Sequence, residues 1–84
     1  MNTLNKKILI VDDSDLNRAL LNDILHDRFE IIEAKNGMEA MAIMHEHSSD
    51  ISLMLLDIVM PNMDGFEVLA MMNKHGWIET TPVI

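Results

Sequence analysis

Hydrophobic and polar positions form blocks along the chain that predict strands and helices in turn. Short, continuous apolar runs at residues 8–11 and 51–56 are typical of strands covered on both faces of a parallel sheet. Residues 29–34 form a shorter run flanked by charges, which indicates a strand near a sheet edge. Residues 80–84 resemble the opening of a fourth buried strand.

The segments between these runs have the periodicity and end signals of helices. Residues 14 to about 28 carry apolar side chains at helical spacing, and either Asp13 or Ser14 can serve as the N-cap. Asn36 and Glu39 have the spacing of a capping box, which predicts the start of a second helix.

A third helix is predicted after the run at 51–56. Asp64 and Glu67 repeat the capping-box spacing, and His75 followed by Gly76 should end this helix. Pro61 lies in the connection before it and disfavours helix at the preceding residue. Strands and helices therefore alternate with short connections, which predicts an α/β fold with a parallel sheet and right-handed crossovers.

Three carboxylates follow two of the predicted strands. Asp12 and Asp13 close the run at 8–11, and Asp57 closes the run at 51–56. Taken singly, each residue can be a helix cap or a solvated turn residue. The carboxyl ends of parallel strands, however, meet at the edge of the sheet where ligands bind. Three acids there would repel one another without a hard cation, so the joint pattern predicts a magnesium-assisted phosphate site.

Composition narrows the function classes. The chain has 84 residues and a formal net charge of −8, which opposes binding to DNA, RNA or anionic lipid. Apolar residues make up 49 %, too many for a disordered chain. There is no cysteine, the first residues lack the apolar core of a signal peptide, and no run approaches a membrane span. We therefore expect one cytoplasmic domain, or part of one, in residues 1–84.

Four motifs together resemble the receiver domain of two-component response regulators, which has a flavodoxin-like doubly wound fold. The resemblance runs from about Lys7 to Ile84 and covers the N-terminal part of such a domain. The motifs are the strand with its acid pair at 8–13, the strand with its single acid at 53–57, the loop at 60–65 and the segment 81–84.

The resemblance implies roles for matching residues. Asp57 would accept a phosphoryl group from a phosphohistidine on a sensor histidine kinase or a phosphotransfer protein. Asp12 and Asp13 would hold Mg²⁺ (or Mn²⁺), one directly and one through water, with Asp57 and the backbone carbonyl of Val59 as further ligands. The loop after the third strand would be shaped by four residues, Met60, Pro61, Asp64 and Gly65.

The family pattern also includes residues without a match in these 84. Receiver domains carry a Ser or Thr at the end of the fourth strand and a Lys at the end of the fifth. Thr80 and Thr81 precede the fourth strand, so neither is that switch residue. We expect such a truncated domain (βαβαβαβ) to be phosphorylated slowly, to be impaired in switching, and to self-associate through surfaces that the missing elements would cover.

Two alternatives stay open at this level. In a non-phosphorylated interaction module, the acids would fail to bind Mg²⁺. A phosphatase of the haloacid-dehalogenase type uses an Asp-x-Asp motif, and Asp13-Ser14-Asp15 has that spacing, but this leaves Asp57 unexplained. His45 and His47 are interpreted as surface residues, because two helical positions separated by two project to different sides.

Overall fold

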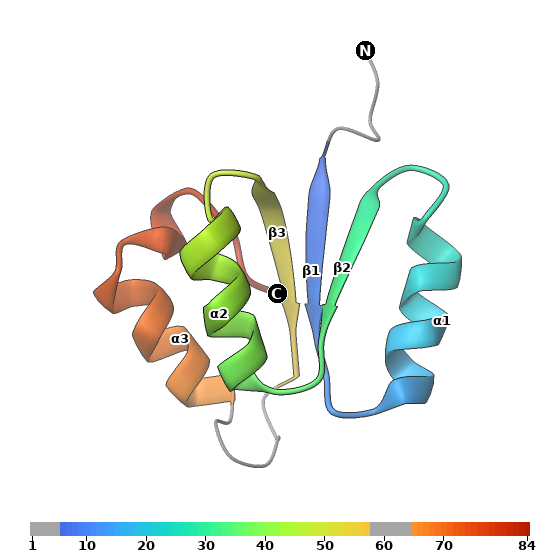
Figure 1. Ribbon diagram of the computed structural model, residues 1–84, viewed down its shortest axis with the longest axis horizontal. Coiled ribbons are helices and arrows are strands. Elements are labelled where there is room, and N and C mark those ends of the chain that lie inside the picture. Colours follow the sequence, from blue (N-terminus) through green and yellow to red (C-terminus); the bar gives the residue numbers. More distant parts are fainter. Residues whose placement is uncertain (1–5, 58–64) are drawn as a thin grey trace.

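The structure is a computed structural model that describes residues 6–57 and 65–84. Within them strands and helices alternate as the sequence predicts (Figure 1). The elements are β1 (Lys7–Val11), α1 (Asp15–Leu25), β2 (Glu30–Ala34), α2 (Gly37–His47), β3 (Ile51–Leu56), α3 (Gly65–Lys74) and a short 3-10 helix, η2 (Trp77–Glu79).

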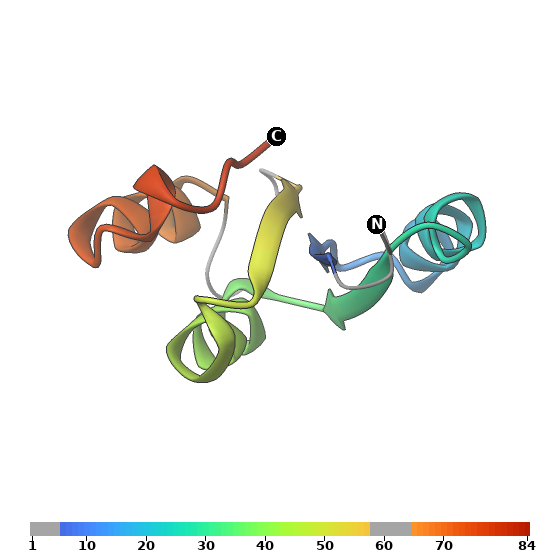
Figure 2. The ribbon, with the colours of Figure 1, turned by 90° about the horizontal axis from the view of Figure 1, so that it is seen from above.

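The described strands form one parallel sheet with the order β2-β1-β3. The central β1 pairs with both neighbours, so that Ile10 lies between Glu33 of β2 and Leu55 of β3. The charged strand β2 is at an edge, as predicted. Figure 2 shows α1 on one face of the sheet and α2 with α3 on the other, which is a doubly wound arrangement.

Residues 82–84 add to the sheet beside β3. The amide of Met54 donates to the carbonyl oxygen of Pro82 at 2.9 Å, and the amide of Ile84 donates to the carbonyl oxygen of Met54 at 2.9 Å. Val83 and Met54 form a parallel bridge. The opening of a fourth strand is therefore present as a single bridge beside β3, and the order β2-β1-β3 matches the flavodoxin-like fold that the resemblance implies.

The main core lies between the sheet and α2 and α3. Its fully buried side chains include Leu9, Met44, Met54, Val68 and Met72, so several of the methionines are core residues. They belong to one buried cluster that joins β1 and β3 to α2 and α3.

The other face is less covered. The apolar positions of α1 have the predicted helical spacing, but Leu16, Leu20 and Ile24 are 68 %, 52 % and 71 % exposed. We call these three residues the α1 stripe. The one buried residue of α1 is Arg18. The periodicity thus predicted the helix correctly, whereas its apolar side does not meet the core of the described residues.

Local capping explains where the helices begin. Ser14 is the N-cap of α1, because its hydroxyl accepts a hydrogen bond from the amide of Asn17 at 3.2 Å. The side chain of Asn36 accepts from the amide of Glu39 at 2.8 Å, and the Glu39 carboxylate accepts from the amide of Lys35 at 3.0 Å. The predicted capping box therefore forms, with its return bond one residue earlier than usual.

The helix ends differ slightly from the prediction. α1 ends at Leu25, about three residues early, and the ring of His26 donates to the carbonyl oxygen of Asn22 at 3.0 Å. This hydrogen bond, and then the nearby charge of Asp27, raise the pKa of His26 above its ordinary value of 6.5. α3 ends at Lys74, and Gly76 adopts a left-handed φ of 74°, as expected of a helix-terminating glycine.

Candidate functional site

The structure brings the three predicted carboxylates together at the carboxyl edge of the sheet. Each of Asp12, Asp13 and Asp57 offers an oxygen, and these oxygens all lie within 4.8 Å of one another. The parallel hydrogen bonding continues just past the strands, since the amide of Asp57 donates to the carbonyl oxygen of Val11 at 2.8 Å. The backbone therefore fixes where the acids of β1 and β3 meet.

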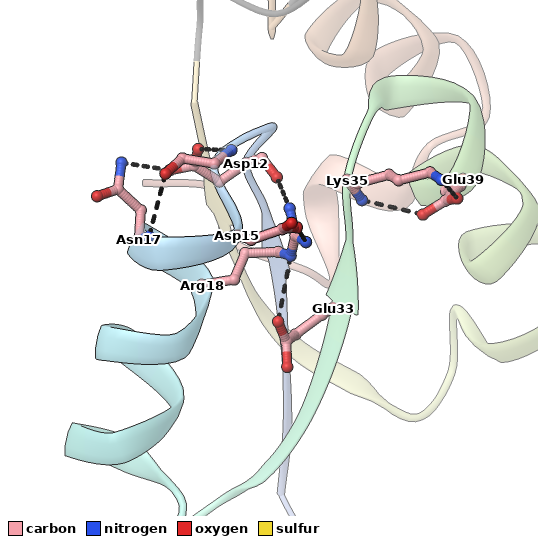
Figure 3. Close-up of polar contacts among 8 residues, drawn as sticks. Asp12, Asp15, Asn17, Arg18, Glu33, Lys35 and Glu39 are labelled. Carbon is pink, nitrogen blue, oxygen red and sulfur yellow. Dashed lines mark hydrogen bonds and ion pairs between the residues drawn. The ribbon is translucent and has the colours of Figure 1, made fainter.

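Asp12 is oriented by neighbouring donors. Its Oδ1 accepts from the amide of Ser14 at 2.9 Å, and its Oδ2 accepts from the side-chain amide of Asn17 at 3.4 Å (Figure 3). Asp12 and Asp57 are half-buried, whereas Asp13 is exposed. The cluster thus combines two partly shielded carboxylates with one that faces solvent.

Arg18 lies next to this edge and contacts three segments of the chain. Its guanidinium donates to the backbone carbonyl of Asp12 and to the carboxylate of Asp15, and its Nε lies 3.1 Å from Oε1 of Glu33 (Figure 3). One side chain therefore connects the end of β1, the first turn of α1 and β2. Sequence reasoning missed Arg18. The Asp15–Arg18 spacing indicates an ion pair within the helix, but nothing local indicates the contact with Glu33.

A cavity of about 310 Å³ opens beside the carboxylates, on the α1 face of the sheet. Asp12, Asn17 and Asp57 form its polar side, and the rest of its lining is apolar: Ile10, Val11, Leu21, Leu55, Leu56 and Ile84. If the carboxylates held a cation that offset their negative charge, a small anion bound to that cation would have room in this cavity.

The donor set fits a hard divalent cation. Three carboxylates whose oxygens approach within 4.8 Å repel one another unless a cation neutralises them. Carboxylate oxygens are the ligands that Mg²⁺ prefers, and Mg²⁺ keeps waters at its remaining positions. The exposed side of Asp13 leaves room for such waters. Chemically, the site can hold Mg²⁺ among three carboxylates.

Comparison with known proteins identifies the family. The family model described as "Response regulator receiver domain" matches residues 8–84. The chain belongs to this receiver domain family. Chemotaxis protein CheY of Halobacterium salinarum is 49 % identical over 63 residues, which are 74 % of this chain and 51 % of that protein. Transcriptional regulatory protein SrrA of Staphylococcus aureus is 40 % identical over 96 % of this chain and 32 % of its own length.

Solved receiver domains share the fold. A CheY-like receiver domain protein from Methanospirillum hungatei has a TM-score of 0.83 and 28 % identity, over 94 % of this chain and 62 % of that one. The response regulator TrrA of Thermotoga maritima, in complex with Mg²⁺ and BeF, has a TM-score of 0.82 and 34 % identity, over 93 % of this chain and 65 % of that one. The chain spans about one third to two thirds of the length of these four proteins.

Other predicted positions of the receiver domain can now be placed. Gly65 is buried and begins α3, whereas Val59, Met60, Pro61 and Asp64 lie outside the described residues.

The two threonines near the end of the chain lie far from the carboxylates. Thr81 is buried, and its hydroxyl donates to the carbonyl oxygen of Ile51, the first residue of β3, at 3.1 Å. The hydroxyl of Thr80 donates to the carbonyl oxygen of Trp77 at 3.3 Å. Both therefore sit at the amino end of β3, consistent with the inference that neither is the switch residue.

The phosphatase alternative gains no support. Asp15 is not among the three clustered acids; it pairs with Arg18, and its side chain is 93 % exposed.

In the described residues, no helix is long and apolar enough to cross a membrane.

Replacing Arg18 by methionine is expected to lower the free energy of unfolding by about 1–2 kcal/mol, because the half-buried carbonyl of Asp12 loses a charged donor while the apolar stem is kept. Chemical denaturation measures this. The exposed Arg28 offers a control, and Arg28→Met should change the unfolding free energy by less than about 0.5 kcal/mol. Equal effects of the two substitutions would contradict the connecting role of Arg18.

Proposed function

We propose that this chain is a phosphoacceptor module of two-component signalling, in which Asp57 receives a phosphoryl group with the help of Mg²⁺. The observation that carries the proposal is the convergence of Asp12, Asp13 and Asp57, with oxygens within 4.8 Å of one another. The donor is a phosphohistidine on a sensor histidine kinase or a phosphotransfer protein. In this role the chain is a signalling module rather than an enzyme with a released product.

The proposed reaction is a phosphoryl transfer to Asp57. A carboxylate oxygen of Asp57 attacks phosphorus, the phosphorus–nitrogen bond of the donor breaks, and the imidazole leaves, which gives an acyl phosphate on Asp57. A Mg²⁺ ion, when bound, neutralises charge on the phosphoryl oxygens during this in-line transfer. Asp12 and Asp13 would hold that ion, and the hydrogen bonds from the Ser14 amide and the Asn17 side chain restrict the rotation of the Asp12 carboxylate.

Further support comes from the relatives. The Thermotoga maritima regulator whose structure contains Mg²⁺ and BeF aligns with 93 % of this chain. The backbone carbonyl of Val59 is proposed as an additional ligand from the family resemblance. We also propose that residues 1–84 are the N-terminal part of a receiver domain, since they span 51 % of the halobacterial chemotaxis protein. We also propose that the chain self-associates through the exposed α1 stripe.

Adding millimolar Mg²⁺ is expected to raise the melting temperature of the chain. A ligand at ten times its dissociation constant stabilises the folded state by about 1.4 kcal/mol, which corresponds to several degrees in a domain of this size. Asp13→Ala should abolish the shift. Asp23→Ala removes an exposed acid of α1 that is outside the cluster, so this variant should keep the shift in melting temperature.

The same melts separate the proposal from its alternative. A wild-type chain that shows no shift with either Mg²⁺ or Mn²⁺ has no assembled cation site, and the interaction-module alternative would then be preferred. An equal shift in wild type and Asp13→Ala would place the cation elsewhere.

A further inference from the structure

Three aromatic rings from separate segments meet near the C-terminal ends of α2 and α3, which point away from the carboxyl ends of the strands. His45 lies near the end of α2, His75 directly follows α3, and Trp77 begins η2 (Figure 1). The ring centroids of His45 and His75 are 5.0 Å apart, and those of His45 and Trp77 are also 5.0 Å apart. His75 stacks on Trp77 with a centroid distance of 4.5 Å and an interplanar angle of 21°.

The backbone holds these rings in place. His45 is within α2, and the amide of His75 donates to the carbonyl oxygen of Met71 at 3.0 Å. Gly76 turns the chain with its left-handed φ of 74°. Trp77 is half-buried and packs against the core. The two imidazoles are therefore attached to segments whose positions the fold determines.

Both imidazole side chains belong to exposed residues. Neither the His45 ring nor the His75 ring has a hydrogen bond or an ion pair in the part of the chain that the structure describes. Stacking on Trp77 uses the face of the His75 ring, whereas the nitrogens lie at its edge. Neutral imidazole nitrogens are good ligands for borderline transition metals.

The spacing of the two rings matches coordination of one ion. A metal–nitrogen bond of about 2.0–2.1 Å puts the metal about 3.2 Å from each ring centroid, so angles of 90–109° at the metal require centroids about 4.5–5.2 Å apart. The observed separation is 5.0 Å. The centroid lies close to the Cβ–Cγ axis, and this torsion has a broad energy minimum. Rotation about it therefore aims the nitrogens at a common point while the centroid separation stays nearly constant.

We propose that His45 and His75 form a binding site for a divalent transition metal ion, with waters at the remaining positions. By the Irving–Williams order Cu²⁺ binds most tightly, and Ni²⁺ and Zn²⁺ bind more weakly. The ion joins the end of α2 to the segment after α3. Mg²⁺ prefers oxygen ligands and does not compete. The site is chemically and spatially separate from the carboxylate cluster, so it stands or falls independently of phosphorylation.

Trp77 provides the measurement, because it is the only tryptophan of the chain. Cu²⁺ quenches indole fluorescence at short range, so titration with Cu²⁺ in excess Mg²⁺ should give saturable quenching at one ion per chain. His45→Phe and His75→Phe keep a ring in the cluster but remove the nitrogens. Each should weaken binding by about tenfold or more, since even the loss of outer-shell partners commonly costs that much.

His47, two residues after His45, provides the matched control. His47 is on the same helix and lies near Glu46 and Asp50, at 3.6 and 3.7 Å. His47→Phe should bind Cu²⁺ as the wild-type chain does, and Zn²⁺ should displace Cu²⁺ only at higher concentration. Far-UV circular dichroism verifies that each variant is folded. Quenching that does not saturate would indicate an adventitious ion only, and this result would overturn the proposal. So does saturable quenching that both phenylalanine variants at positions 45 and 75 retain.

Discussion

Asp57→Asn is expected to reduce phosphorylation of the chain by at least about 100-fold while leaving its fold intact. The neutral amide has nearly the shape of the carboxylate but is a far weaker nucleophile, and it removes one negative charge from the cation site. The amide of residue 57 still donates to the carbonyl oxygen of Val11, so the end of β3 is retained. A selective loss of chemistry, with little change in stability, is the signature of a nucleophile.

The experiment uses acetyl phosphate with Mg²⁺ and follows the phosphoryl adduct by intact-protein mass spectrometry. Labelling of the wild-type chain itself should be slow, because the Ser or Thr and the Lys that the family resemblance implies have no match in these residues. Asp23→Asn is the control and should label like wild type. If Asp57→Asn labels at the wild-type rate, another residue is the nucleophile.

Much of the fold follows from local sequence features. The continuous apolar runs at residues 8–11 and 51–56 predict buried strands because both faces of a central strand are covered. Asp12 and Asp57 mark where those strands end, and Asn36 with Glu39 marks a helix start. Because parallel strands place their carboxyl ends at one edge, convergence of the three acids could also be predicted.

Contacts between distant segments could not be predicted in this way. Arg18 reaches Glu33, fifteen residues away on β2, and its burial depends on how α1 docks on the sheet. The meeting of His45 with His75 and Trp77 depends on α2 and α3 lying on the same face with their ends aligned. Periodicity within one helix contains no information about which ring of another helix lies opposite.

The α1 stripe shows the same distinction between local and non-local information. The spacing of Leu16, Leu20 and Ile24 predicts an amphipathic helix. Whether that apolar side meets the core depends on which other elements share the face of the sheet. Here the three side chains are 52–71 % exposed.

The chain is expected to form dimers at micromolar concentration. The α1 stripe exposes three adjacent aliphatic side chains, and Ile84, at the end of the segment that pairs with β3, is 76 % exposed. An apolar helix face and an open sheet edge both favour association with a second copy, which covers them symmetrically. The net charge of −8 opposes this association, so added salt should strengthen the dimer.

Sedimentation equilibrium at low and high salt measures the dimer, and substitution identifies its surface. Burial of a leucine or isoleucine side chain contributes about 1.5–3 kcal/mol, so combined Leu16→Gln and Leu20→Gln should shift the chain to monomer. Met38, on α2, is 62 % exposed and lies outside the α1 stripe. Met38→Gln should therefore leave the dimer unchanged. A wild-type monomer that melts cooperatively at all concentrations would show that the exposed stripe is tolerated in water, and the proposed association would be wrong.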